Sequence, residues 1–204
     1  MITILFDVDN TLYPKNIGLF NVVDKKINQY LKDIVGIPET DVNKVRKDYL
    51  EKYGTTLNGL IKHHNINPVH YLEYVHNVDL ENYIKVNHRL KNFLKKSKYR
   101  NIIFSNAYLP YIKKILKLME IEEYFEDIFD ITKLNYTPKP LLEAYLSIIN
   151  AKALIPEKTF FIDDSSKNLL SAKKIGFKTC YISEIVNTEF DFNIKNIHEI
   201  EFFL

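Results

Sequence analysis

Residues 2–14 read ITILFDVDNTLYP, an apolar run that stops at two aspartates separated by a single valine. A short apolar run without alternation is typical of a parallel strand that is buried on both faces. Ligands of open α/β sheets gather beyond the carboxyl ends of such strands. Asp7 and Asp9 are therefore candidate functional carboxylates, although a solvated acidic turn in which Asp9 caps a helix explains this pair alone equally well.

Similar apolar runs recur along the chain, each followed by a polar turn and a helical pattern. The further predicted strands are Asn101–Phe104, Thr159–Ile162, Lys178–Ile182 and a weaker one at Asp127–Ile131. Helical spacing is found at Pro110–Leu118, Lys139–Ile149 and Ser165–Ile175, the last with Gly176 as a stop. Strands that alternate with helices predict an α/β fold with a doubly wound, Rossmann-like parallel sheet as its core.

The segment between the first two strands is far longer than one crossover needs. It contains helical patterns at Phe20–Leu31, Thr40–Lys52 and Pro68–Val75, with turns predicted around Gly54 and at Asn65–Pro68. We therefore expect a helical cap domain over residues 15–87, inserted into a core domain of residues 1–14 and 88–204.

Composition excludes several classes of protein. The chain has 28 basic and 26 acidic residues, a net charge of +2, and no block of like charges, which argues against partners such as nucleic acid polymers or a membrane surface. No apolar run approaches the ~20 residues of a membrane span, and the N-terminal residues do not resemble a signal peptide. Cys180, the single cysteine, is expected to be buried and inert. We expect a cytoplasmic protein, either a monomer or a homodimer.

A second pair of aspartates strengthens the functional interpretation of Asp7 and Asp9. Asp163 and Asp164 directly follow the predicted strand Thr159–Ile162. If both strands are central, four aspartates converge, and their repulsion needs a compensating charge. Carboxylates together with a substrate phosphate and water are the ligands that Mg²⁺ prefers. A helix-capping role for Asp164 is compatible with such a site.

Two further predicted elements carry groups suited to a phosphate. Ser105 and Asn106 follow the strand Asn101–Phe104 and offer a hydroxyl and an amide, although Ser-Asn is also an ordinary turn. Lys139 lies between two prolines at the predicted start of a helix, where its ammonium group could offset the charge of a phosphoryl group. An arbitrary lysine is far more often simply solvated.

Taken together, these segments resemble the four ordered motifs of the haloacid dehalogenase-like hydrolase superfamily. The matching residues are Asp7-Val8-Asp9-Asn10-Thr11, Ser105, Lys139 and Asp163-Asp164. The chain is similar to the pyrimidine 5′-nucleotidase-like branch in Asp9–Pro14, Tyr53–Leu60, Lys139-Pro140 with Tyr145, and Asp163-Asp164-Ser165 followed by Asn168-Leu169. It departs from the family pattern at Pro110 and Tyr111, where a basic residue and a histidine are expected, and at Glu120, where a glycine is usual.

The resemblance implies a magnesium-dependent phosphatase for a small phosphomonoester. Asp7 would be the nucleophile and Asp9 the general acid and base, while Ser105, Asn106 and Lys139 would bind the phosphoryl group. The carboxylates of Asp7 and Asp164 and the main-chain carbonyl of Asp9 would hold Mg²⁺, and Asp163 would orient Lys139. Within the cap, the candidates for substrate recognition are Tyr53, Thr55, Thr56 and Asn58; the alternative is that Gly54–Leu60 only caps and packs a helix.

Among substrates, a nucleoside 5′-monophosphate ranks first, and a sugar phosphate or another small metabolite is the alternative. A true dehalogenase needs no Mg²⁺ and would leave Asp9 and Asp164 without a role, and a mutase would need a cap that retains its intermediate. A non-catalytic protein that binds a phosphorylated ligand is disfavoured because the four motifs are intact. The cap histidines lack matched acidic partners and are not expected to bind metal: His63, His64, His70 and His76.

Overall fold

The computed structural model describes residues 1–204, which form two compact units. Unit 1 consists of Met1–Ile17 and Leu80–Leu204, and unit 2 is the insertion Gly18–Asp79. Unit 2 begins three residues after the start of the expected cap domain and ends eight residues before its expected end. The difference arises because two short 3-10 helices at Lys15–Ile17 (η1) and Leu80–Asn82 (η2) belong to unit 1. None of the helices combines the length and the apolar character that crossing a membrane requires.

Unit 1 is built on a six-stranded sheet in the order β3-β2-β1-β4-β5-β6, and every pair of neighbouring strands is parallel. The strands are β1 (Thr3–Phe6), β2 (Arg100–Phe104), β3 (Asp127–Phe129), β4 (Thr159–Asp163), β5 (Lys178–Ile182) and β6 (Phe192–Ile194). The predicted doubly wound α/β core is confirmed. The sequence pattern missed β6, because three residues are too few to show a periodicity.

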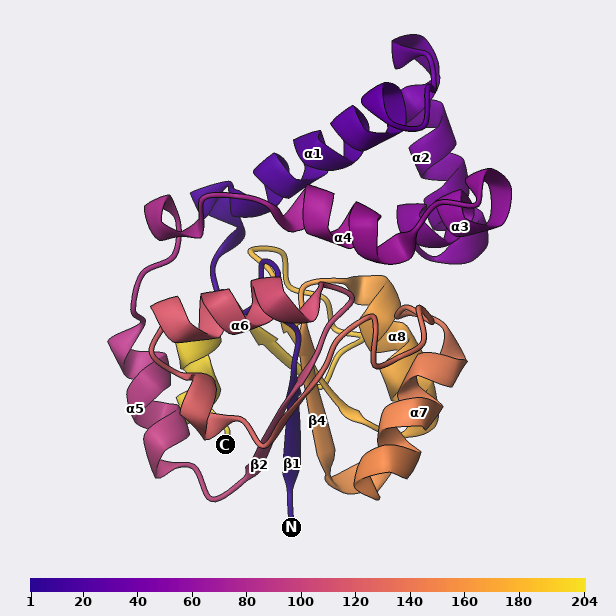
Figure 1. The fold of residues 1–204 in the computed structure, drawn as a ribbon. Helices are drawn as coiled ribbons and strands as arrows, with labels where there is room; N and C mark the ends of the chain where they lie inside the picture. Colours follow the sequence, from indigo (N-terminus) through magenta and orange to yellow (C-terminus); the bar gives the residue numbers. More distant parts are fainter. The chain divides into compact units, whose positions relative to one another are not determined.

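Helices cover both faces of the sheet. Figure 1 shows α5 (His88–Lys96) and α6 (Leu109–Leu118) on one side of β1, β2 and β4, and α7 (Leu142–Lys152) and α8 (Ser166–Ile175) on the other. The remaining turns of 3-10 helix in this unit are η3 (Glu122–Tyr124), η4 (Pro156–Lys158) and η5 (Ile197–Phe202). Because β1 lies between two strands and two helical layers, Ile4, Leu5 and Phe6 are fully buried, which explains the unbroken apolar run.

One side of the core shows how the sequence positions the strand ends. Leu5, Phe104 and Phe161 from three neighbouring strands pack with residues of α7 and α8 in a single buried cluster. The tyrosine ring of Tyr145 from α7 makes edge contacts with both Phe104 and Phe161. This packing fixes the register of β2, β1 and β4, and therefore the height at which their carboxyl ends finish.

The structure corrects the prediction that a helix starts at Lys139. The helix α7 begins at Leu142, and Lys139 lies in the turn before it. The physical reason is its neighbour: a residue that precedes a proline, here Pro140, is disfavoured in the helical region of backbone space. The position of Lys139 therefore depends on contacts with other segments.

Unit 2 contains four helices, α1 (Leu19–Asp33), α2 (Glu39–Tyr53), α3 (Thr56–His64) and α4 (Pro68–His76). In this unit α1 packs on α4, and α2 packs on α3 (Figure 1). The turn predicted around Gly54 is confirmed, since Gly54 ends α2 with a φ of 79°. The helix α3 itself was not predicted, because Gly59 in its interior weakens the helical pattern.

Candidate active site

Asp7 follows β1 directly and lies at the centre of a buried polar cluster. Its neighbours are set by register: Phe6 pairs with Ile103 of β2 and with Ile162 of β4. The side chain of Asp7 is largely buried, its Oδ1 accepts a hydrogen bond from Lys139 at 2.8 Å, and its Oδ2 accepts one from Thr11 at 3.4 Å.

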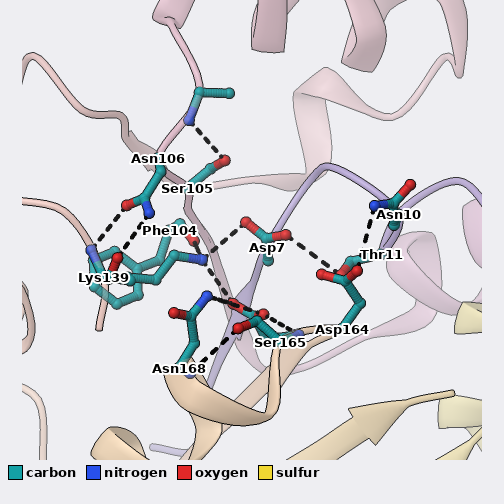
Figure 2. Close-up of polar contacts among 12 residues, drawn as sticks. Asp7, Asn10, Thr11, Phe104, Ser105, Asn106, Lys139, Asp164, Ser165 and Asn168 are labelled. Atoms are coloured by element: carbon teal, nitrogen blue, oxygen red, sulfur yellow. Dashed lines mark hydrogen bonds and ion pairs between the residues drawn. The ribbon is translucent and has the colours of Figure 1, made fainter. Parts of the chain in front are cut away.

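Lys139 is a buried cation whose three donors are all used. Its Nζ donates to Oδ1 of Asp7, to Oδ2 of Asp163 and to the main-chain carbonyl of Phe104, each at 2.8 Å. Burial alone would lower the pKa of Lys139, but attraction to Asp163 and Asp7 outweighs it and the pKa is raised. The ammonium group therefore stays charged, and Figure 2 shows it directed at Asp7.

The main chain of Lys139 is fixed by the side chain of Asn106, which follows β2. The Asn106 amide accepts from the Lys139 N–H and donates to the Lys139 carbonyl, both at 2.9 Å (Figure 2). This pair of bonds replaces the helix start that was predicted at Lys139. Because both ends of the amide are engaged there, substrate binding by Asn106 stays a prediction.

The Ser105 hydroxyl lies at the same carboxyl edge of the sheet. The side chain is buried, and its Oγ accepts the N–H of Ala107 at 3.2 Å. A hydroxyl that accepts one bond still has its own hydrogen to donate. Ser105 can therefore supply one donor to a negatively charged group bound at this edge.

Asp163, the last residue of β4, is completely buried and saturated with hydrogen bonds. Its Oδ2 accepts from Lys139 at 2.8 Å and from the Asn168 amide at 3.0 Å. Its Oδ1 accepts the Ser165 N–H at 2.7 Å and the same amide at 3.1 Å. With both oxygens occupied, Asp163 is suited to holding Lys139 in place.

Asp164 points back toward β1 from the next position along the chain. Its Oδ2 accepts from the Asn10 amide at 3.3 Å (Figure 2). Burial, and then repulsion from Asp7 and Asp163, raises the pKa of Asp164 to about 7. The charged form of Asp164 is thus disfavoured first by burial and then by the negative charge of its two neighbours.

The donor set fits a hard divalent cation. One carboxylate oxygen each from Asp7, Asp163 and Asp164 lies within 4.8 Å of the others, and the one buried ammonium group among them belongs to Lys139. Three carboxylates against one ammonium leave two negative charges, which a divalent ion would neutralise. Since Asp163 is saturated, Asp7 and Asp164 are the carboxylates with capacity for it.

Asp9 is held by two tyrosines, a contact that the sequence analysis missed. Its Oδ1 accepts from Tyr13 at 2.5 Å and from Tyr111 at 2.8 Å. Burial, and then the charge of Asp7, raises the pKa of Asp9 to about 6, while the two hydroxyls lower it in part. The signal in the sequence was the departure from the family pattern at Tyr111, which gave no indication of its partner.

The candidate recognition residues of unit 2 are engaged in local contacts. Thr55 caps α3 by accepting the Asn58 N–H, the Asn58 amide donates to the Tyr53 carbonyl, and Thr56 is buried. Leu57 and Leu60 are buried as well, in keeping with the alternative that this segment caps and packs a helix. A role in substrate recognition stays a prediction.

The four histidines of unit 2 all have partners within this unit. His63, His64 and His70 each pair a ring nitrogen with a tyrosine hydroxyl, and His76 pairs Nδ1 with the Leu72 carbonyl. The hydroxyls belong to Tyr53, Tyr49 and Tyr30, in that order. These contacts give the histidines a structural use.

The chain is similar in sequence to curated proteins along most of its length. "Phosphate metabolism protein 8" of Saccharomyces cerevisiae is 26% identical over 192 residues, which covers 84% of this chain and 58% of the yeast protein. This chain thus spans less than two thirds of the length of that relative. "Pyrophosphatase PpaX" of Halalkalibacterium halodurans is 26% identical over 200 residues, covering 92% of this chain and 86% of the relative.

The fold is shared with solved structures. A haloacid dehalogenase (HAD) phosphatase from Thermococcus onnurineus superposes with a TM-score of 0.64 at 19% identity, covering 98% of this chain and 96% of that one. Residues 4–182, from β1 to the end of β5, match the family model described as "Haloacid dehalogenase-like hydrolase". The matched span contains every carboxylate of the buried cluster together with Lys139. The chain therefore belongs to the haloacid dehalogenase-like hydrolase family.

Proposed function

We propose that this hydrolase is a magnesium-dependent phosphatase in which Asp7 is the nucleophile. The observation that carries the proposal is the ammonium group of Lys139, which lies 2.8 Å from Oδ1 of Asp7 at the centre of the carboxylate cluster. A buried cation beside a carboxylate stabilises negative charge that develops when a phosphoryl group approaches. The names of the curated relatives, a phosphate metabolism protein and a pyrophosphatase, point to the same chemistry.

In the first step, an oxygen of the Asp7 carboxylate forms a bond to phosphorus while the bond between phosphorus and the ester oxygen breaks. Protonated Asp9 gives its proton to the departing oxygen. In the second step, Asp9 takes a proton from water, the water oxygen bonds to phosphorus, and the bond to Asp7 breaks. A pKa of about 6 suits Asp9 to both directions of transfer near neutral pH.

Other residues of the chain hold the phosphoryl group in place. Lys139 and the Ser105 hydroxyl would contact its oxygens, and Asp163 keeps Lys139 oriented. The residues that would hold Mg²⁺ are Asp7 and Asp164 through their carboxylates and Asp9 through its main-chain carbonyl. When bound, this ion would withdraw charge from the phosphoryl group and reduce its repulsion from Asp7.

For the substrate, we propose a nucleoside 5′-monophosphate, with a sugar phosphate or another small phosphorylated metabolite as the alternative. The support is the resemblance to the pyrimidine 5′-nucleotidase-like branch, which extends into unit 2. There the ring of Tyr53 would stack on a base. Thr55, Thr56 and Asn58 would contact its polar groups after giving up the local contacts and burial described above. Such a unit would act as a cap that selects the leaving group.

The test is a phosphate-release screen over nucleoside monophosphates and sugar phosphates, with Mg²⁺ present, for the wild type and for Asp7→Asn. We expect release from a nucleotide by the wild type and a loss of at least roughly a thousandfold in Asp7→Asn with the fold retained. Near-normal turnover by Asp7→Asn would contradict the mechanism. Release from sugar phosphates alone would keep the mechanism and change the substrate class. Tight binding of phosphorylated ligands without turnover would instead favour a non-catalytic protein.

A further inference from the structure

Two tyrosine hydroxyls converge on a single oxygen of Asp9. Oδ1 of Asp9 lies 2.5 Å from the Tyr13 hydroxyl and 2.8 Å from the Tyr111 hydroxyl, and the two hydroxyl oxygens lie 3.2 Å apart. Both tyrosine residues are 3% exposed, so the contacts are shielded from water. A carboxylate oxygen has the lone pairs to accept both bonds at once.

The two tyrosines come from different parts of unit 1. Tyr13 belongs to the turn after β1, four residues beyond Asp9, and Tyr111 belongs to the first turn of α6. Tyr13 is therefore carried by the segment that also carries Asp9, whereas Tyr111 comes from α6, 102 residues beyond Asp9 in the sequence. Because the second ring is fixed by the packing of α6, it can hold the turn after β1 to the helical layer.

Both hydroxyls remain protonated donors. Burial, and then the charge of Asp9, raises the pKa of Tyr13 and of Tyr111 well above the ordinary value for a phenol. Each hydroxyl has one hydrogen, so when both donate to Asp9 neither is left for the contact between the two tyrosines. The two phenol hydroxyls therefore both donate a hydrogen bond to Oδ1 of Asp9.

We propose, resting on the phosphatase function above, that Tyr13 and Tyr111 are positioning residues that hold Oδ1 of Asp9 and leave Oδ2 to exchange the proton. A free aspartate side chain can rotate about two torsions, and an acid that is misplaced by about 1 Å can lose roughly a hundredfold in rate. Because Oδ1 is held by two hydrogen bonds, the direction of Oδ2 is fixed as well. Packing alone does not need this arrangement, since phenylalanine would fill the same space without a hydroxyl.

The leaving group provides the test. Phenyl phosphate and p-nitrophenyl phosphate differ little in shape, but phenoxide leaves poorly without a proton, whereas p-nitrophenoxide leaves readily. The ratio kcat/KM reports the steps up to departure of this group. We expect Tyr111→Phe to lower kcat/KM for phenyl phosphate roughly tenfold or more and for p-nitrophenyl phosphate less than about threefold. Tyr13→Phe should likewise lower kcat/KM more for phenyl phosphate than for p-nitrophenyl phosphate.

The matched control is Tyr99→Phe. The Tyr99 hydroxyl donates to the Leu204 carbonyl at 2.7 Å and lies just before β2, at the opposite end of the strands from Asp9. Tyr99→Phe removes a phenol hydroxyl from the same unit and should leave the ratio of the kcat/KM values for the two substrates unchanged. Thermal unfolding of each variant checks that the fold is retained.

A double-mutant cycle separates direct coupling from a general effect. In an Asp9→Asn background there is no acid to position, so Tyr111→Phe should not lower kcat/KM further for either substrate. An equal fall for both substrates, or an undiminished effect in the Asp9→Asn background, would overturn the positioning role. Hydrolysis that persists in Asp7→Asn would instead overturn the phosphatase mechanism, and the positioning role with it.

Discussion

Lys139 shows how one residue can stabilise a site that is otherwise repulsive. Its side chain is 1% exposed and lies between the carboxylates of Asp7 and Asp163, whose side chains are 10% and 0% exposed. Burying charges is costly unless each is paired and hydrogen-bonded, and here all three donors of the ammonium group have acceptors. Removing the cation therefore removes more than one contact.

We expect Lys139→Met to abolish activity and to destabilise the fold. The change leaves two buried carboxylates facing a side chain of similar length without charge, and breaking a buried pair from one side costs about 3–5 kcal/mol. Urea unfolding in the presence of EDTA measures the loss, with Lys174→Met, an exposed lysine of α8, as the control. A stability equal to that of the wild type would contradict this account of the charges.

A second prediction concerns Asn106, whose amide fixes the main chain of Lys139 through two hydrogen bonds. Asn106→Ala removes both, so Lys139 should lose its alignment with Asp7. We expect kcat to fall roughly 10- to 100-fold with little change in KM, as is found when groups that orient a ligand are removed. A rise in KM with kcat preserved would show instead that the amide binds substrate.

The element scale shows what the sequence predicts well and what it does not. Strands buried on both faces and helices with one apolar stripe leave clear patterns, and β1, β4, β5 and α8 are found where these patterns predict them. Two elements were not predicted: β6 has only three residues, and Gly59 interrupts the helical pattern of α3. The start of α7 was misplaced because the preference of the residue before Pro140 outweighs the helical spacing.

A cluster of ion pairs joins β2, β3 and α7 at the edge of the sheet. Glu126 accepts from Arg100 at 2.8 and 3.0 Å and from Lys152 at 3.2 Å. The hydrogen bond from Arg100 outweighs partial burial, and together with Lys152 it lowers the pKa of Glu126 from an ordinary 4.5 to about 2. The folded protein therefore binds this proton more weakly than the unfolded chain does.

We expect Glu126→Gln to make unfolding less sensitive to acid. With a lowered pKa in the folded state, the stabilisation by Glu126 is complete above pH 4.5 and is lost as the pH falls toward 2. Because the side chain is 40% exposed, we expect roughly 1 kcal/mol at neutral pH after screening by solvent. Urea midpoints of wild type and variant should converge between these pH values. Glu143→Gln, at an exposed position of α7, is the control. Urea midpoints of wild type and Glu126→Gln that stay equally far apart over this pH range would contradict the prediction.

The whole molecule brings the site together from segments that local sequence patterns cannot connect. The acid pairs after β1 and β4 could be predicted to meet, because parallel strands carry their ends to one edge. The hydrogen bonds of Tyr111 with Asp9 and of Asn106 with the main chain of Lys139 could not be predicted. Each depends on the exact placement of a turn against its neighbour. These contacts are set by packing, and no short motif records them.

A cation bound among the carboxylates should stabilise the folded protein as a whole. A ligand at a concentration of 100 Kd adds about 2.7 kcal/mol to the free energy of unfolding, which for a chain of this size is a rise in Tm of roughly 5–10 °C. We expect MgCl₂ to produce this shift in the wild type and not in Asp164→Ala. NaCl at equal ionic strength serves as the control, and an equal shift with it would contradict specific binding.

The strand order also has a consequence for how the protein is made. Translation produces β1 first, yet its two neighbours are β2, which begins at Arg100, and β4, which begins at Thr159. A nascent chain therefore carries Asp7 before Lys139, which lies 132 residues further along, and before Asp163. The central strand can be enclosed only after β4 has left the ribosome, which makes its closure a late, long-range event. Recovery of catalysis during refolding would then mark the completed insertion of β1, and it should lag behind the return of helical circular dichroism.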